Sequence, residues 1–176
     1  RFTMSRSLGN VIGDSLELCL GYSERLLKDV TPEQFARYAV VNGKVIESNH
    51  PAFAYGHLCL YGPRIFSQFG KTGPVAPEAF EAVFSKDAKC TDDPDGKIYP
   101  SMSVVSQVYF DGYKAALELL RSLPDSEFQV ANPVGGRMTD LFPTLGSLHT
   151  FYCGGHMMMH LGQVSAWRRM MNLGAA

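Results

Sequence analysis

Apolar residues recur at steps of three and four along four long stretches of the chain, and each stretch predicts an amphipathic helix. The four run from about Met4 to Lys28, from Pro51 to Gly70, from Ser101 or Ser103 to Leu123, and from Thr144, the expected cap, to about Asn172. The fourth is apolar nearly all round, so we expect its helix to be the most buried. The pattern predicts an all-α four-helix bundle in which two of the three connections are long.

The second helix carries clear signals at its start, middle and end. Pro51 suits the first helical position, where its missing N–H costs nothing, and either Asn49 or His50 then caps the helix. Pro63 lies inside the segment and should kink it. Gly70 is the expected stop, because glycine readily adopts the conformation that ends a helix.

The connections between the helices carry turn signals. Asn42-Gly43 is a pair typical of hairpin turns, so residues 39–46 form either a small hairpin or a loop leading into the second helix. Residues 73–100 are a proline-containing connection that includes a short helix around Glu78 to Phe84. Asp93-Pro-Asp-Gly96 matches part of a calcium-loop pattern, but two required ligand positions lack acidic side chains, which makes it an acidic turn.

The composition fits a globular protein. The 176 residues are 45% hydrophobic and 19% charged, and this length suits one domain, residues 1–176, with its own core. A net charge of -1 without a basic block argues against binding to nucleic acid or to an acidic membrane surface. No apolar run reaches the length of a membrane span, and residues 1–6 do not lead into a signal-peptide core, so we expect a cytoplasmic protein.

Cysteine usage agrees with a reducing compartment. Cys19, Cys59 and Cys153 lie in apolar helical patterns, Cys90 lies in a polar loop, and the chain has no C-x-x-C motif. Isolated cysteines inside helices are more often reduced core residues than disulfide partners, so we expect free thiols.

Two histidines in the fourth helix mark a candidate metal site. His156 and His160 are four residues apart, so they lie on one face of a helix one turn from each other. His57 faces inward on the second helix, and we expect the fold to bring it against this pair. Burying an unpaired imidazole costs on the order of 1–3 kcal/mol, so the rings need partners. Hydrogen bonds to carbonyls or tyrosines are the alternative, but three inward histidines favour a metal ion.

The other two histidines are too distant along their helices to join this set. His149 precedes His156 by seven residues, roughly 10 Å of helix, so it cannot share one ion with both His156 and His160. It either lines the pocket or has a structural role. His50 precedes His57 by the same interval, and its place at the start of the helix explains it as a cap.

Several neighbours are candidates for the surroundings of the ion. Cys153 could face the site, where a role in the pocket wall or in the core is favoured over one as a further ligand, and Tyr61 is a second pocket candidate. Gln163 could orient a ligand histidine by a hydrogen bond. Met157, Met158 and Met159 spread over some 200° around a helix and cannot converge on one ion, so we expect them to pack in the core.

Three imidazole ligands leave open positions on the ion, as in reactive rather than structural sites. Met157 follows His156, so the H-E-x-x-H pattern of metalloproteases and its glutamate base are absent. The site therefore fits activation of a ligand that is already a good nucleophile, such as a thiol. Gly154, Gly155 and Gly162 flank the pair, and close helix approach, room for a ligand or simple packing would each explain them.

Three segments together resemble the DinB/YfiT-like superfamily. They are Asn49-His-Pro-Ala-Phe-Ala-Tyr-Gly-His57-Leu58, Ile98-Tyr-Pro-Ser101, and His156-Met-Met-Met-His160-Leu-Gly-Gln163-Val164 with Trp167-Arg-Arg169. The resemblance implies a four-helix bundle with long crossover connections, often a homodimer, and a divalent ion held by His57, His156 and His160. The chain departs from the family where Phe53 or Tyr55 replaces a tryptophan ahead of the second-helix histidine, which alters the pocket rather than the ligands.

Characterised relatives in this superfamily are thiol-dependent transferases and isomerases. The resemblance therefore implies a metal-dependent thiol S-transferase, or a related hydrolase or isomerase, that activates a small thiol or water and acts on an electrophile. The expected ion is zinc or nickel, with iron or manganese as alternatives. The sequence does not indicate which residue would act as a catalytic base. A non-catalytic metal-binding or stress-associated bundle and a metal-free packing module remain the competing hypotheses.

Overall fold

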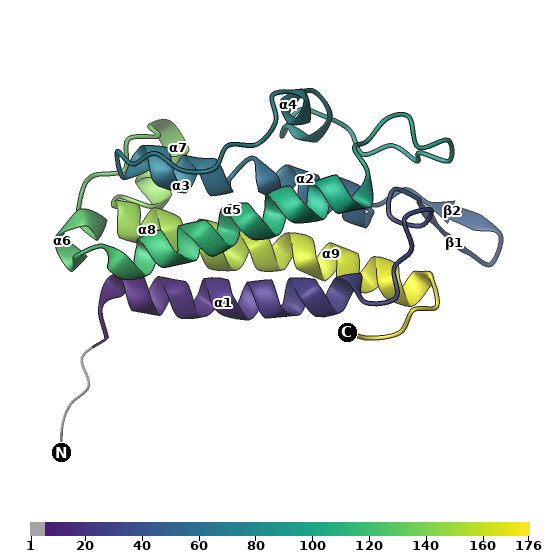
Figure 1. The fold of residues 1–176 in the computed structure, drawn as a ribbon, viewed down its shortest axis with the longest axis horizontal. Coiled ribbons are helices and arrows are strands. Elements are labelled where there is room, and N and C mark those ends of the chain that lie inside the picture. The colour runs from purple at the N-terminus through teal and green to yellow at the C-terminus, as the bar shows by residue number, and fades with distance from the viewer. Residues whose placement is uncertain (1–5) are drawn as a thin grey trace, which may run out of the picture.

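The long helices of the protein lie side by side with their axes roughly aligned in a computed structural model that describes residues 6–176 (Figure 1). Helix α1 (Leu8–Leu27) packs against α5 (Met102–Ser122) and against the C-terminal helical segment. Helix α2 (Pro51–Cys59) contacts both α5 and that C-terminal segment. The chain is predominantly helical, as an all-α fold requires. Within the described residues, every helix falls short of the length and apolar character needed to cross a membrane.

Helix α1 ends where the sequence pattern predicts, but it begins later. Its last residue is Leu27, and Lys28 is the cap. At the start, the side chain of Ser7 accepts a hydrogen bond from the backbone N–H of Asn10, which caps the first turn at Leu8. The predicted start at about Met4 falls outside the described residues.

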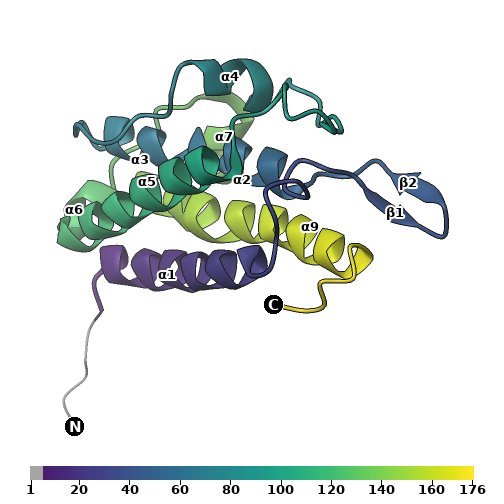
Figure 2. The ribbon, with the colours of Figure 1, turned by 45° about the vertical axis from the view of Figure 1, so that its right-hand side comes forward.

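The segment around Asn42-Gly43 forms the small hairpin, so the alternative of a plain loop is wrong. Strands β1 (Ala39–Val41) and β2 (Lys44–Ile46) are antiparallel. Asn42 and Gly43 have φ values of 51° and 76°, as a two-residue turn with two left-handed positions requires. The hairpin projects from the helices near the C-terminal end of the last one (Figure 2).

The second predicted helix is broken into two rather than kinked. His50 caps α2 through its ring nitrogen, and α2 ends at Cys59. Helix α3 (Gly62–Gln68) then begins, with Pro63 in its first turn. Proline has no N–H to donate to the carbonyl of Cys59 but is well suited to a first helical turn, which favours the start of a new helix at this point. Gly70, with φ of 64°, follows α3 as expected.

The long connections contain short helices. Helix α4 (Ala79–Phe84) confirms the short helix expected in residues 73–100, and it packs on α2. Helices α6 (Asp125–Phe128) and α7 (Gly136–Leu141) were not predicted, because segments of four to six residues are too short to show periodicity. The acidic turn is confirmed, since the Asp93 carboxylate accepts hydrogen bonds from three backbone N–H groups of residues 97–99.

The C-terminal helical segment is not one uniform α-helix. Helix α8 (Leu145–Thr150), capped by Thr144, is followed by a π-helical segment, η1 (Phe151–His156), and then by α9 (Met157–Met170). At Gly154 an added Cβ would lie 2.8 Å from the Ser15 hydroxyl oxygen, so this glycine serves close approach of α1. At Gly162 nothing lies within 4 Å of that position, so close approach does not explain this second glycine.

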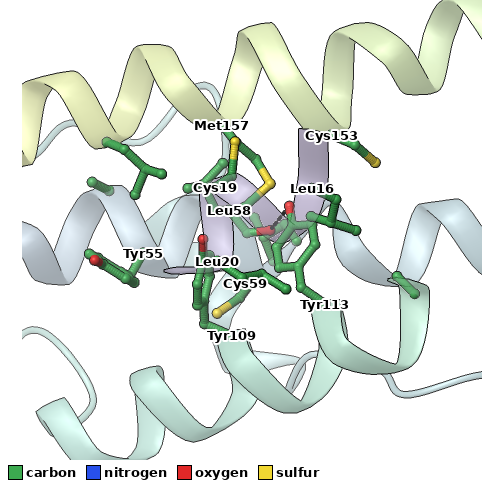
Figure 3. Packing of buried hydrophobic residues seen from close by; sticks show 14 of the residues in the cluster. Leu16, Cys19, Leu20, Tyr55, Leu58, Cys59, Tyr109, Tyr113, Cys153 and Met157 are labelled. Atoms are coloured by element: carbon green, nitrogen blue, oxygen red, sulfur yellow. Dashed lines mark hydrogen bonds between the residues drawn. The ribbon is translucent and has the colours of Figure 1, made fainter. Parts of the chain in front are cut away.

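A layer of aromatic and sulfur-containing side chains fills the space between α1, α2, α5 and the C-terminal segment (Figure 3). The Tyr109 hydroxyl shares a hydrogen bond of 2.7 Å with the Ser23 hydroxyl, and Tyr55 donates to the carbonyl of Ser23. Tyr113 donates to the carbonyl of Leu58. Each buried phenol therefore has a partner. The cysteines are all free, as predicted. Cys19, Cys59 and Cys153 are buried in helical segments, and Cys90 is buried as well, although it follows α4 in a polar loop.

The expectation that the fourth predicted helix is the most buried is wrong. Every residue of α2 is buried, because α4, α5 and α9 all pack on it. The C-terminal segment instead keeps one exposed face, which carries Gly155, Met158, Met159, Gly162 and Ala166. An apolar sequence pattern does not distinguish a helix enclosed on all sides from one that exposes methionine, glycine and alanine.

Candidate metal centre

The three histidines singled out from the sequence come together in the structure. His57 lies in α2, His156 ends η1, and His160 lies in the first turn of α9. One ring nitrogen from each lies within 4.8 Å of those of the other two. The ring centroid of His160 lies 4.8 Å from those of His57 and His156, and the centroids of His57 and His156 are 5.6 Å apart. All three side chains are buried.

The winding of the chain sets the spacing of the pair on the C-terminal segment. The π-helical segment ends at His156 and α-helical geometry begins at Met157. His160 therefore follows one α-helical turn after His156 and faces the same side. Single π-helical turns inside α-helices occur frequently at functional sites. This segment brings His156 into register with the inward face of α2.

A hydrogen bond from outside α2 orients the ring of His57. Its Nδ1 lies 2.8 Å from the carbonyl oxygen of Phe84, the last residue of α4. A carbonyl only accepts, so Nδ1 carries the proton and Nε2 keeps a free lone pair. Gly56 makes this contact possible, because an added Cβ there would lie 2.3 Å from the Phe84 ring.

A chain of amide groups orients His160 in the same way. Its Nδ1 lies 3.0 Å from Oε1 of Gln163, which confirms the contact expected for that glutamine. The same oxygen accepts a hydrogen bond of 3.0 Å from the side-chain amide of Asn49, just before α2. His160 therefore also carries its proton on Nδ1 and leaves Nε2 free. The sequence indicates for Asn49 only a position at the start of α2, and nothing in it links this residue to Gln163, 114 residues away.

His156 has no such partner among the described residues. Its Nδ1 is buried and makes no hydrogen bond to protein. The ring packs among aromatic side chains instead, with the Tyr61 centroid at 4.5 Å and the Tyr152 centroid at 5.6 Å. An imidazole buried without a polar partner is costly, so this ring is suited to an additional ligand in the site.

Burial keeps these rings neutral. Loss of hydration on burial is the main cause that lowers the pKa of His57, His156 and His160. For His156 the pKa falls to about 3, and the neighbouring His160, His57 and Arg64 add to the effect of burial. A neutral imidazole offers a lone pair, which is the form that binds a metal ion.

A pocket of about 530 Å³ opens onto the histidines. Tyr61 lines it, as expected, and its ring is covered on one face by the guanidinium of Arg64 at 4.5 Å. Residues after α4 supply the opposite wall, which the sequence did not predict: Ser85, Lys86, Ala88, Lys89 and Cys90. Their only signal was position in a long connection, since long connections are often functional.

Cys153 does not belong to this site. Its thiol is fully buried in the core layer, outside the cluster of possible ligands, and burial raises its pKa far above the ordinary value (Figure 3). The expectation that it faces the ion assumed α-helical winding. A π-helical turn contains more residues, so each residue turns the chain by a smaller angle and three residues fall well short of a full turn. Cys153 therefore lies at a wider angle from His156 than α-helical winding would give.

The structure also places the remaining histidines and the three methionines. His50 caps α2 and its Nε2 lies 2.9 Å from the Thr91 carbonyl, so it is structural. His149 is fully buried against Phe69, and neither ring nitrogen has a hydrogen-bond partner in the described chain. Of the three methionines expected in the core, Met157 is buried, whereas Met158 and Met159 are exposed and Met159 borders the pocket.

Comparison with the known protein families and with curated proteins produced no match to this chain.

Proposed function

We propose that this protein is a DinB-like four-helix bundle that binds a divalent metal ion through His57, His156 and His160. The four members of the bundle would be α1, the α2–α3 pair, α5 and the α8–η1–α9 segment. The observation that carries the proposal is the convergence of three buried, neutral imidazoles on one point. Buried polar groups normally have partners, and a shared cation supplies one for all three rings.

The donor set fits such an ion. The protons on Nδ1 of His57 and His160 are held by oxygen acceptors, so both Nε2 lone pairs are free. Metal-bound histidines characteristically donate their other N–H in this way. His156 contributes a ring without any hydrogen bond to protein. Imidazole ligands suit zinc, nickel and iron, and we propose zinc or nickel first, with iron or manganese as alternatives.

We further propose that the protein is a metal-dependent enzyme that activates a small thiol or water, in the manner of a thiol transferase. A bound divalent ion would lower the pKa of such a group, because it stabilises the deprotonated form. In a transfer reaction the S–H bond breaks and the proton passes to solvent. The sulfur then bonds to the electrophilic carbon, and the leaving group departs with its electron pair.

The protein's own residues would orient and shield the reacting groups. The Phe84 carbonyl and the Gln163–Asn49 pair hold the rings of His57 and His160. Tyr61 and Phe53 provide aromatic walls beside the histidines, which exclude water from part of the pocket. No carboxylate lies among the described residues lining the pocket, so a thiol, which ionises easily, is a better substrate than water.

Metal binding is tested first, by titrating zinc into metal-free wild type and His57→Ala and measuring heat. We expect one site in the wild type and a loss of at least about a hundredfold in affinity in the variant. His149→Leu is the matched control, because it removes a buried histidine that lies outside the cluster. Equal zinc affinity in wild type and His57→Ala would refute the metal site.

Catalysis is tested on the metal-loaded protein with a chromogenic aryl halide and a panel of small thiols. We expect metal-dependent conjugation that is lost in His57→Ala and kept in His149→Leu. Stoichiometric zinc without turnover on any thiol would refute the enzyme and leave a non-catalytic metal-binding bundle.

A further inference from the structure

The charged side chains that line the pocket beside the three histidines are all lysines. Two lysines, Lys86 and Lys89, line it, and no aspartate or glutamate is among its described lining residues. Asp87 lies between them in sequence but does not line the pocket. Neither ammonium group has a carboxylate within 4.0 Å in the described chain. Two exposed lysines without carboxylate partners therefore border the pocket that holds the histidines.

The proposed metal centre adds to this positive charge. His57, His156 and His160 would be neutral ligands, because an imidazole binds a metal ion through the lone pair of an uncharged ring. A divalent ion held by them would keep its full charge, since no protein carboxylate lies in the cluster. Positive charge in a cleft raises the local concentration of anions and favours their binding.

The other residues that line the pocket indicate which further features a ligand must have. Phe53, Tyr61 and Met159 contribute apolar surface to the same pocket. A volume of about 530 Å³ lies within the range for small-molecule sites. The pocket thus combines apolar side chains, two lysines and the ring nitrogens of the three histidines.

We propose that the pocket selects a small carboxylate-bearing thiol, with Lys86 and Lys89 binding the carboxylate while the sulfur reaches the histidine cluster. This inference rests on the proposed function and names its class of substrate. Lys86 and Lys89 are the residues that determine this charge selectivity.

The test uses three thiols that differ in charge: 3-mercaptopropionate, 2-mercaptoethanol and cysteamine. Their dissociation constants are measured on zinc-loaded wild type and on Lys86→Gln/Lys89→Gln. Each exposed lysine contributes modestly to such a pair, so we expect the preference for the anionic over the neutral thiol to fall about three- to tenfold in the double variant. Comparing the same probes on both proteins cancels differences in intrinsic thiol acidity.

Matched controls isolate the position of the charges. Lys71→Gln/Lys114→Gln makes the same change in net charge at exposed lysines outside the pocket and should keep the wild-type preference. Lys86→Arg/Lys89→Arg should also keep it, because the charges remain. An unchanged preference in Lys86→Gln/Lys89→Gln, or an equal fall in the Lys71/Lys114 control, would overturn the inference.

A second arm separates this inference from the metal site. Succinate, which carries carboxylates but no thiol, is titrated into metal-free protein while the amide chemical shifts of residues 85–90 are followed. We expect saturable shifts in wild type that disappear in Lys86→Gln/Lys89→Gln and weaken with added salt, because exposed charges are screened. Absent shifts in wild type would overturn the anion site even if zinc binds, whereas failed zinc binding with intact succinate shifts would overturn only the metal centre.

Discussion

Replacing Gly56 by alanine tests how the fold orients His57. Gly56 lies in α2 directly before His57, and an added Cβ would lie 2.3 Å from two atoms of the Phe84 ring. Carbon atoms in contact prefer separations of about 3.5–4.0 Å, so the ring must move by more than about 1 Å. Phe84 is fully buried, and its ring packs against Phe80 at 5.1 Å and Tyr99 at 5.5 Å. Neighbouring rings therefore resist the movement.

The cost of Gly56→Ala follows from these contacts. Overpacking a core costs about 1–3 kcal/mol, and the enclosed ring favours the upper value. The hydrogen bond from His57 to the Phe84 carbonyl contributes about 1 kcal/mol, which is lost if residue 84 moves. Alanine gains about 1 kcal/mol over glycine in a helix. The net loss is about 3 kcal/mol, or roughly 6–12 °C in the unfolding temperature of a chain of this length.

Thermal unfolding of metal-free protein measures the stability effect, with Gly112→Ala as the control. Gly112 is also a buried glycine inside a helix, but nothing lies within 4 Å of its added Cβ. The control should unfold at or above the wild-type temperature, because it gains the helix preference without the clash. Gly56→Ala unfolding no lower than Gly112→Ala would refute the packing argument.

Zinc titration of the same two variants measures the effect on the site. Groups that orient metal-binding histidines typically contribute 10- to 100-fold to affinity, so Gly56→Ala should bind zinc about 10- to 100-fold more weakly. Gly112→Ala should bind like wild type. If Gly56→Ala is destabilised but binds zinc normally, the Phe84 carbonyl does not orient His57.

Two further predictions concern stability away from the site. Arg168 is buried and donates hydrogen bonds to the carbonyls of Leu26, Lys28 and Leu173. Arg168→Met should therefore lower the free energy of unfolding, measured in urea, by about 3 kcal/mol. An unchanged value would show that these helix ends need no such donor. Burial lowers the pKa of His149 from its ordinary 6.5 to about 4. Between these pH values the unfolded chain binds a proton at this residue and the folded chain does not. The free energy of unfolding should therefore fall by about 3 kcal/mol as the pH drops from 6.5 to 4. His149→Leu should remove this part of the pH dependence in urea unfolding curves, and an identical slope in the two proteins would contradict it.

Much of the secondary structure was predictable because its determinants are local. The starts of α2, α5 and α8 follow from His50, Ser101 and Thr144, whose side chains accept hydrogen bonds from backbone N–H groups three residues on. The hairpin follows from Asn42 and Gly43 in the same way. Each signal acts within one turn of chain, so it can be read without the fold.

The histidine cluster was predictable in part. The spacing of His156 and His160 places them on one helical face, and the inward position of His57 suggested their meeting. Of the two positions favoured for Cys153, the structure shows the core and not the pocket wall, because the chain winds as a π-helix before His156. Close approach of α1 at Gly154 accompanies that winding, and it is a tertiary contact without a signature in the periodicity.

The sequence alone thus determined which long segments are helical, where most of them begin and which three histidines are candidates for one site. Tertiary structure decided what surrounds these rings: the Phe84 carbonyl on His57, the Asn49–Gln163 pair on His160, and the two lysines that line the pocket. The physical reason is the range of the interactions. Helix periodicity and capping act over three or four residues, whereas the contacts that orient the histidines join groups far apart in the chain and form only when the helices pack.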